Sequence, residues 1–448
     1  MQSFQEMTLE ELIREGGYDC DCGRHHGTGL KYLKIGRGAA GFLPEAMATL
    51  GFKKPFIVCD AHTKAAAWER VRPALAAAGI EYVLYTLEGD PIEPDEHAVG
   101  ALCMNFDPRC DCVLAVGSGV INDCCKVLAH AVGRPQMVVG TAPSMDGYAS
   151  NSSSMIRNRV KVTLYNACPC VILADTDILC QAPERMLWAG LGDMLAKYIA
   201  LCEWRISNIV TGEYYCERVA GLMRHSLDKI VTAAPRLMTR DPDTIAAIAE
   251  GLILSGIAMS FAQVSRPASG LEHYFSHLWE MFAMDRGLPT ELHGIQVGVG
   301  TRLCLHIYDR LRAVTPSRAV AEQAMADFDP ARWEAEIRRI FGKAAQTLID
   351  SERTLWHQND PANHQLRLNR ILGHWDELLA IMEAELPDTG RIVSLMRQVG
   401  MPMRPADIAE SEQDTRDAFT GSRSIRDKYL TSSLLWDLGL LDTFPLDT

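Results

Sequence analysis

Three histidines in the second half of the chain have the residue type and spacing of metal ligands. His273 and His277 are four positions apart in the segment GLEHYFSH, so on a helix both imidazole rings lie on one face. His293 follows after a turn with Gly287 and Pro289, which reverses the chain between two predicted helices. Two helices can thus direct imidazoles at one point, as a transition-metal ion requires. Histidines on apolar helices are more often ordinary core residues, and this alternative stays open.

A carboxylate within an otherwise apolar segment offers a further ligand. Asp193 lies in the segment GLGDMLAK, for which we predict a buried helix. Burial of an unpaired carboxylate costs several kcal/mol, and a divalent cation would offset this cost. Asp193 is therefore the best candidate to complete a metal site with the histidines.

A glycine-containing turn in the first half of the chain has the features of a diphosphate-binding site. In the segment VGSGVINDCCK, Gly117 and Gly119 stand where a predicted strand changes to a helix. Glycines let the backbone approach a pyrophosphate, and the first N–H groups of a helix complement its charge. The pattern differs from the GxGxxG dinucleotide fingerprint, so an ordinary strand-to-helix turn explains the segment equally well.

Asp60, at the end of an earlier predicted strand, bears on the choice of nucleotide. A carboxylate at such a place accepts hydrogen bonds from a ribose 2'-hydroxyl and repels a 2'-phosphate, which favours NAD over NADP. Aspartate is also a common first residue of a helix, where it caps the backbone. Both roles of Asp60 remain open.

The segment DCDCGRHH, with Cys20, Cys22, His25 and His26, is a second place where thiolates and imidazoles are close in sequence. The Cys-X-Cys pair lacks the two-residue spacing of common zinc sites, and no second pair of this kind lies nearby. We therefore favour the interpretation of these residues as ordinary side chains. The chain has 14 cysteines, many of them in apolar runs, which is typical of a protein of the reducing cytoplasm.

Short strands alternate with helices in the first part of the chain, and this alternation predicts a parallel sheet covered by helices. After Pro183 long segments with a helical period of about 3.6 residues follow. Residues 183–207 are expected to form a core helix, and residues 328–385 an outer helical layer. The predicted strands are PFIVCD (55–60), EYVLYTLEG (81–89), CVLAVGSG (112–119), PQMVVGTAP (135–143) and VILAD (171–175).

Length and charge limit the domain organisation and the partners. With 448 residues the chain should form two domains. The change of composition near residues 176–183 predicts the boundary, and the motifs above assign dinucleotide binding to an α/β domain over 1–180 and metal and substrate binding to an all-α domain over 181–448. A net charge of -13 argues against nucleic acid and anionic membrane surfaces as partners. The N-terminus has no signal-peptide pattern, and no segment is expected to approach the roughly eighteen apolar residues of a membrane span.

Seven motifs that run in order along the chain resemble those of sn-glycerol-1-phosphate dehydrogenase, particularly its bacterial branch. They are VGSGVINDCCK, TAPSMDGYASNSS, KVTLYNACPCVILAD, WAGLGDMLAK, GLEHYFSH, LHGIQVGVGT and SRSIRDKYLTSSLLWDLGLL. The family is related to iron-containing alcohol dehydrogenases, glycerol dehydrogenases and 3-dehydroquinate synthases. The resemblance implies a dehydroquinate synthase-like fold, with an α/β NAD domain followed by an all-α metal domain.

The resemblance also implies the roles of individual residues and the reaction. The expected activity is the NAD(H)-dependent reduction of dihydroxyacetone phosphate to sn-glycerol 1-phosphate, in a cytoplasmic homo-oligomer for which a dimer is favoured. One zinc or nickel ion would be held by Asp193, His273 and His293, and these three and His277 would be the catalytic residues. Substrate would contact Asp146, Asp193, His277 and, on grounds of charge, Lys161. The expected NAD contacts are Asp60, Gly117, Ser118, Gly119, Val120, Ile121, Thr141, Ser144 and Ser150.

The chain departs from the family pattern at three positions without losing a predicted ligand. Ser118 stands where glycine is frequent, Met145 stands where histidine is usual, and Lys197 replaces a further histidine of the alcohol dehydrogenases. A 3-dehydroquinate synthase-like cyclase or lyase is an alternative, but such enzymes carry glutamate where this chain has Asp193. A catalytically silent binding protein of the same fold is a further alternative, although both the glycine turn and the ligands are present.

Overall fold

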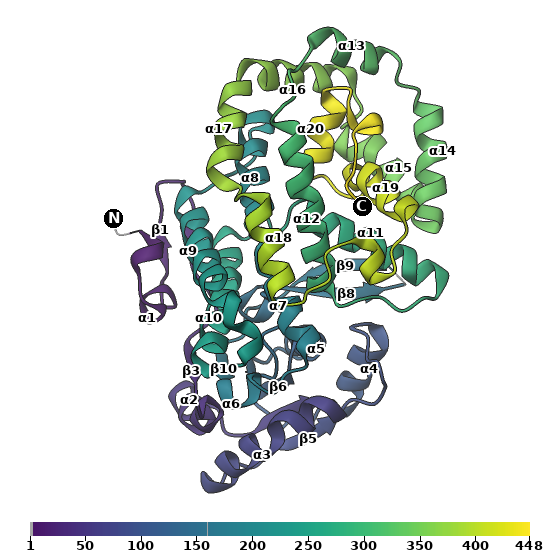
Figure 1. The fold of residues 1–448 in the computed structure, drawn as a ribbon. Coiled ribbons are helices and arrows are strands. Elements are labelled where there is room, and N and C mark those ends of the chain that lie inside the picture. Colours follow the sequence, from purple (N-terminus) through teal and green to yellow (C-terminus); the bar gives the residue numbers. More distant parts are fainter. Residues whose placement is uncertain (1–2, 159) are drawn as a thin grey trace. The chain divides into compact units, whose positions relative to one another are not determined.

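A computed structural model describes residues 3–158 and 160–448 (Figure 1). The chain divides into two compact units, which are described separately below. The first, here called the sheet unit, comprises Met1–Leu195 and Cys216–Pro267. The second, here called the helical unit, comprises Ala196–Tyr215 and Ala268–Thr448.

Six parallel strands form the main sheet in the described part of the sheet unit, in the order β3-β10-β7-β6-β4-β5. All residues of β4, β6, β7 and β10 are buried, because helices cover both faces of a parallel sheet of this kind. The predicted α/β fold class is thereby confirmed. The strands are β3 (Tyr32–Gly36), β4 (Pro55–Cys59), β5 (Val83–Thr86), β6 (Cys112–Gly117), β7 (Gln136–Gly140) and β10 (Val171–Asp175).

Helices before, between and after the strands complete the sheet unit. Part of its core consists of Leu114 and Val116 of β6 and Val139 of β7, which belong to one hydrophobic cluster with Trp68 and Val71. The helices are α1 (Leu9–Leu12), α2 (Leu43–Leu50), α3 (Ala61–Ala77), α4 (Glu96–Asn105), α5 (Gly119–Val132), α6 (Thr176–Leu179), α7 (Glu184–Leu195), α9 (Glu217–Ala233) and α10 (Pro242–Ala262).

Two antiparallel hairpins in the sheet unit were not predicted from the sequence. One pairs β1 (Tyr18–Asp19) with β2 (His25–His26), and the other pairs β8 (Ser152–Arg157) with β9 (Val160–Tyr165). The first has strands of two residues, and β8 begins with three serines, so neither shows a clear alternation of apolar and polar residues.

The described part of the helical unit is built of helices, as expected. Helices α11 and α12 pack against each other, α19 packs on α11, and α8 packs against α16 and α17. The predicted outer layer over 328–385 corresponds to α14 to α17. The bounds are α8 (Lys197–Thr211), α11 (Leu271–Arg286), α12 (His293–Leu311), α13 (Arg318–Ala326), α14 (Pro330–Phe341), α15 (Ala345–Ser351), α16 (Pro361–Gly373), α17 (Trp375–Glu385), α18 (Thr389–Gln398), α19 (Glu412–Gly421) and α20 (Thr431–Asp437).

Two sequence-based expectations about helices are corrected. The helix expected over 183–207 is two helices, α7 and α8, which meet at Ala196. Helix α10 has the length and composition of a membrane span, with a mean hydropathy of 1.9, so the expectation that no segment approaches one was wrong. Since 83% of this apolar window is buried, α10 is a core helix.

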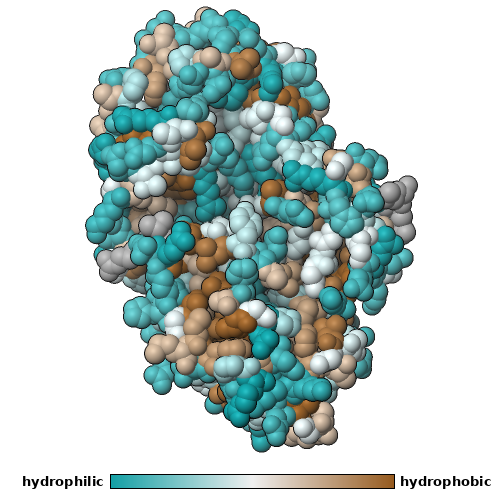
Figure 2. Space-filling model, turned by 180° about the vertical axis from the view of Figure 1, so that it is seen from behind, coloured by the Kyte–Doolittle hydropathy of each residue, from teal (hydrophilic) through white to brown (hydrophobic). Residues whose placement is uncertain are grey.

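The change from strands to helices near residue 180 does not coincide with the division into units. Helices α9 and α10 belong to the sheet unit, because they pack against each other and α10 contacts β3, α6 and α7. As a domain boundary, the position near 180 stays a prediction. On the face drawn in Figure 2, hydrophobic residues are interspersed with hydrophilic ones, as on an ordinary protein surface.

Candidate active site

The predicted nucleotide residues lie where the order of the parallel strands reverses. From β4 the chain continues to β5 on one side, whereas from β6 it continues to β7 and β10 on the other. Ligands of such sheets bind in the crevice beyond the carboxyl ends of the two strands at the reversal. Asp60 follows β4 and the Gly117–Gly119 turn follows β6, so both stand at the carboxyl ends of the two strands at the reversal.

The turn between β6 and α5 requires glycine at its first position. A Cβ on Gly117 would lie 2.5 Å from the Cβ of Ile121, far closer than two carbon atoms that are not bonded to each other can approach. The first helical hydrogen bond of α5 runs from the N–H of Asn122 to the carbonyl of Ser118 at 2.9 Å. The N–H groups of Gly119, Val120 and Ile121 therefore precede the hydrogen-bonded turns of a 14-residue helix, as in anion-binding helix termini.

Asp60 caps helix α3, which was one of its two predicted roles. Its Oδ1 accepts a hydrogen bond of 2.8 Å from the N–H of Thr63, and the Thr63 hydroxyl accepts one of 2.9 Å from the N–H of Asp60. The cap uses one carboxylate oxygen, and Asp60 is half-buried. Capping is therefore compatible with a contact between the other oxygen and a ribose.

The loop after β7 carries the remaining predicted nucleotide residues. The N–H of Thr141 donates to the carbonyl of Gly117 at 3.2 Å, which joins the loop to the glycine turn. Ser144 is half-buried, whereas Ser150 is buried and accepts a hydrogen bond of 3.1 Å from Nζ of Lys126. Lys126 also donates to the carbonyl of Ser152 at 2.9 Å, so this buried lysine holds the end of the loop in place.

Two predicted site carboxylates, Asp146 and Asp193, meet within the sheet unit. The N–H of Asp146 donates to Oδ2 of Asp193 at 2.9 Å. The side chain of Asp146 accepts a hydrogen bond of 2.8 Å from the hydroxyl of Ser255 on α10. Asp193 is 2% exposed, as its apolar segment predicted. Both carboxylates are thus held in defined positions by segments that are distant in sequence.

Two glycines make this close approach possible. A Cβ on Gly190 of α7 would lie 1.9 Å from the carbonyl oxygen of Pro143. A Cβ on Gly256 of α10 would lie 2.8 Å from the carbonyl oxygen of Asp146. The loop is therefore enclosed by α7 and α10 at distances that a side chain at either position would prevent.

The predicted histidine cluster forms in the helical unit. Helix α11 ends at Arg286, the capping residue Gly287 has a φ of 67° that reverses the chain, and α12 begins at His293. The ring centres of His273 and His293 are 5.4 Å apart, those of His277 and His293 are 5.5 Å apart, and those of His273 and His277 are 6.3 Å apart. Three imidazoles thus converge on one point, as the spacing predicts.

Hydrogen bonds fix the orientation of two of these rings. Nδ1 of His273 lies 2.8 Å from Oε1 of Glu272, and because an ionised carboxylate only accepts, Nδ1 is the donor. Nδ1 of His293 lies 2.9 Å from the hydroxyl of Ser276, which itself donates to Gln296 at 2.8 Å. Nδ1 of His293 is therefore also a donor. With Nδ1 as the donor, Nε2 is the nitrogen of each ring that can offer a lone pair to a metal ion.

His277 has a different environment. Its Nδ1 is buried without a hydrogen-bond partner among the described residues and lies 3.8 Å from Oε2 of Glu280. Burial lowers the pKa of His277 well below its usual value, so the ring is neutral at pH 7. His277, Glu280 and His293 each offer an atom within 4.8 Å of the others. These three residues form a possible ligand set that differs from the predicted one.

Lys161, the predicted phosphate partner, lies on β9 in the sheet unit. Burial raises the pKa of Asp123 on α5, and the charges of Lys126 and Lys161 act against this rise. The positive charge of Lys161 therefore lies near the helix that follows the glycine turn.

The sequence-based reasoning missed residues that position the predicted ones. Lys126 orders the loop after β7, and Glu272, Ser276 and Glu280 surround the histidines. Lys126 had a detectable signal, because it is a lysine in the apolar segment CCKVLAHAV. Glu272 and Ser276 had none, since a polar residue next to a histidine on a helix is equally common at the surface.

Comparisons with known proteins show what the chain is similar to. Residues 34–183 match the family model described as iron-containing alcohol dehydrogenase. The chain is 30% identical over 414 residues to a protein of Halalkalibacterium halodurans named glycerol-1-phosphate dehydrogenase, NAD(P)+, covering 92% of this chain and 93% of that protein. A Bacillus licheniformis protein of the same name is 32% identical over 357 residues, covering 78% and 89%.

Solved structures share the fold. A probable glycerol dehydrogenase from Sinorhizobium meliloti superposes with a TM-score of 0.60 at 17% identity, covering 94% of this chain and 98% of that one. At this level of identity the likeness concerns the fold alone.

Proposed function

Because the chain belongs to the glycerol-1-phosphate dehydrogenase family, we propose that it catalyses the reversible reduction of dihydroxyacetone phosphate to sn-glycerol 1-phosphate by NADH. The observation that carries this proposal is the 30% identity over 93% of the Halalkalibacterium relative. The geometry supports it, because one unit has a strand reversal of the kind that binds nucleotides and the other has a histidine cluster.

The nicotinamide nucleotide would bind at the strand reversal of the sheet unit. The N–H groups at the start of α5 would hold the diphosphate, and Gly117 lets the backbone approach it. Asp60 would accept hydrogen bonds from the adenosine ribose, which favours NAD over NADP. The loop joined to the turn through Thr141, with Ser144 and Ser150, would complete the site.

The chain offers suitable ligands for one divalent metal ion. His273 and His293 each carry the lone pair on Nε2, and Asp193 contributes a buried carboxylate. Two imidazoles, a carboxylate and an open position suit a catalytic zinc or nickel ion. When bound, such an ion supplies Lewis-acid polarisation of the substrate carbonyl.

The remaining side chains would orient the substrate and handle its proton. Lys161 would neutralise the phosphate, and Asp146 would accept a hydrogen bond from the substrate hydroxyl. As hydride reaches the carbonyl carbon, negative charge develops on the oxygen, which must be protonated. His277 is half-buried at the cluster and its pKa is lowered, so the neutral ring would relay this proton through water.

An assay with purified enzyme tests the proposed reaction. We expect dihydroxyacetone phosphate to cause continuous loss of NADH absorbance, and a chelator to abolish it reversibly. Product analysis on a chiral phase should give the sn-1 enantiomer. Oxidation limited to one NADH per enzyme, or formation of the sn-3 enantiomer, would overturn the proposal.

Metal analysis of variants tests the ligand set. Asp193→Asn should lose the catalytic metal if Asp193, His273 and His293 are its ligands, whereas Glu280→Gln should retain it. The opposite pattern would assign the metal to the His277, Glu280 and His293 group instead. Light scattering tests the dimer, which we infer from the family. Cell fractionation tests the cytoplasmic location, which we infer from the family and from the cysteine content.

A further inference from the structure

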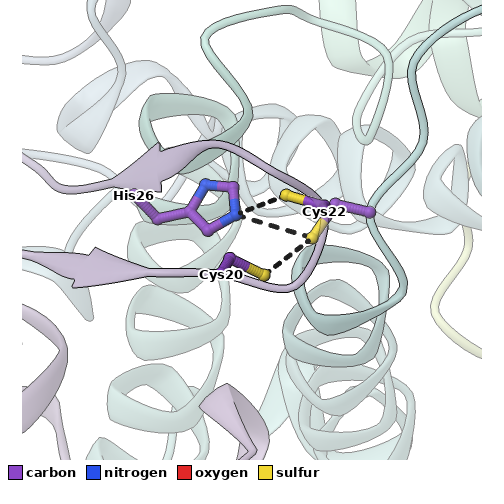
Figure 3. A group of neighbouring side chains, drawn as sticks. Cys20, Cys22 and His26 are labelled. Carbon is purple, nitrogen blue, oxygen red and sulfur yellow. Dashed lines mark hydrogen bonds between the residues drawn. The ribbon is translucent and has the colours of Figure 1, made fainter.

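A second group of side chains that could hold a metal ion lies in the sheet unit and shares no residue with the proposed reaction; Figure 3 labels three of its members. The hairpin of β1 and β2 supplies Cys20, Cys22 and His26, and Cys216 directly precedes α9. Their ligand atoms all lie within 4.8 Å of one another. We propose that these four residues bind a structural zinc ion.

The distances between the ligand atoms match those around tetrahedral zinc. Sγ of Cys22 lies 3.3 Å from Nε2 of His26, Sγ of Cys216 lies 3.6 Å from the same nitrogen, and the sulfurs of Cys20 and Cys216 are 3.8 Å apart. Tetrahedral zinc with bonds of about 2.3 Å to sulfur and about 2.0 Å to nitrogen separates two sulfurs by about 3.8 Å, and sulfur from nitrogen by about 3.5 Å.

The imidazole of His26 is oriented as a ligand. The residue is completely buried, and its Nδ1 lies 2.8 Å from the carbonyl oxygen of Phe261 at the end of α10. A carbonyl only accepts, so Nδ1 carries the hydrogen and Nε2 presents its lone pair to the sulfurs. His25, its neighbour in sequence, is exposed and instead pairs with Asp19 at 2.9 Å.

The sequence-based interpretation of the cysteines as ordinary side chains rested on the spacing of the Cys-X-Cys pair and on the lack of a second pair nearby. Cys216 supplies a further ligand, although it lies 190 positions from His26 in sequence. A disulfide would account for two of the cysteines, whereas zinc accounts for three converging thiols and one oriented imidazole.

Four protein ligands leave no open position, so the proposed ion is structural and not catalytic. Binding would replace the three thiol protons, which pass to solvent. The ion would connect the hairpin, whose strands are only two residues long, to the start of α9. A hairpin this short is not stable by itself, so the metal would anchor the first part of the chain.

Cobalt substitution of the whole enzyme tests the site. Cobalt bound by thiolates has an intense ligand-to-metal charge-transfer band in the near ultraviolet, and the proposed catalytic site contains no thiolate. We expect this band and one thiolate-bound metal per chain in the wild type and in His293→Ala. The result is therefore independent of the proposed catalytic function.

Matched variants identify the ligands. His26→Ala and Cys216→Ser should lose the zinc that a mercurial reagent releases from the wild type, whereas His25→Ala and Cys103→Ser should retain it. Cys103 is an exposed cysteine of α4 and serves as a control for thiol removal. If a ligand variant does not fold, the test relies on the wild type alone. A wild type that releases no zinc to the mercurial reagent and shows no charge-transfer band with cobalt would overturn the proposal. A Cys20–Cys216 disulfide in the metal-free native enzyme would overturn it as well.

Discussion

Glu272 should control how tightly the proposed catalytic metal binds, although it is not one of the proposed ligands. Its side chain is completely buried, and Oε1 accepts hydrogen bonds of 2.8 Å from Nδ1 of His273 and 2.7 Å from the N–H of Gly270. A carboxylate behind a ligating imidazole makes the other ring nitrogen more basic and fixes its orientation. In Glu272→Gln the negative charge is lost while the shape is kept.

The loss of such a partner typically weakens metal binding about 10- to 100-fold, or about 1.4 to 2.8 kcal/mol. Competition with a chromogenic chelator measures the metal affinity directly. We expect zinc affinity to fall by this factor in Glu272→Gln and the rate at saturating metal to fall less.

Glu203 provides a matched control, because it also accepts a hydrogen bond at the N-terminal end of α11. It is also a buried glutamate, and it accepts hydrogen bonds from the N–H groups of Leu271 at 3.0 Å and Thr431 at 2.8 Å. Glu203→Gln should lower the free energy of unfolding and leave metal affinity nearly unchanged. Equal losses of affinity in the two variants, or none in Glu272→Gln, would refute the reasoning.

Four further predictions follow from individual contacts. Asp60→Ser keeps a helix-capping residue but removes the charge, so the preference for NADH over NADPH should fall by about 1 to 3 kcal/mol; a wild type that prefers NADPH would contradict this role. His277→Asn should retain the metal and lower kcat by about 10² to 10⁴, and a fully metallated variant with wild-type kcat would exclude the proton relay. Gly190→Ala places a Cβ 1.9 Å from the Pro143 carbonyl oxygen, so it should lower the free energy of unfolding in urea by about 1 to 3 kcal/mol and also lower kcat. An unchanged urea midpoint would show that the loop with Pro143 can move away without loss of stability. Burial raises the pKa of Glu410 from 4.5 to about 7. Between these two pH values the carboxyl group is protonated in the folded state and ionised in the unfolded state. The stabilisation is complete below the unfolded pKa and is lost as pH rises toward 7, by about 1 to 2 kcal/mol after solvent screening, and urea midpoints should depend less on pH in Glu410→Gln.

The sequence by itself determined those features that depend on neighbouring residues. Strands β4, β6, β7 and β10 were recognisable because a strand covered on both faces is a short apolar run. The convergence of His273 and His277 followed from helical geometry, and that of His293 from a turn with Gly287.

Contacts between distant segments were decided only by the tertiary structure. Nothing near Asp193 in sequence indicates that its carboxylate accepts the N–H of Asp146, or that Gly190 lets the two segments meet. Cys216 likewise joins Cys20 and His26 only because α9 packs in the sheet unit beside the N-terminal hairpin. Periodicity and turn chemistry are local properties, whereas these contacts depend on how closely two packed elements approach, and that distance is set by side chains from several segments at once.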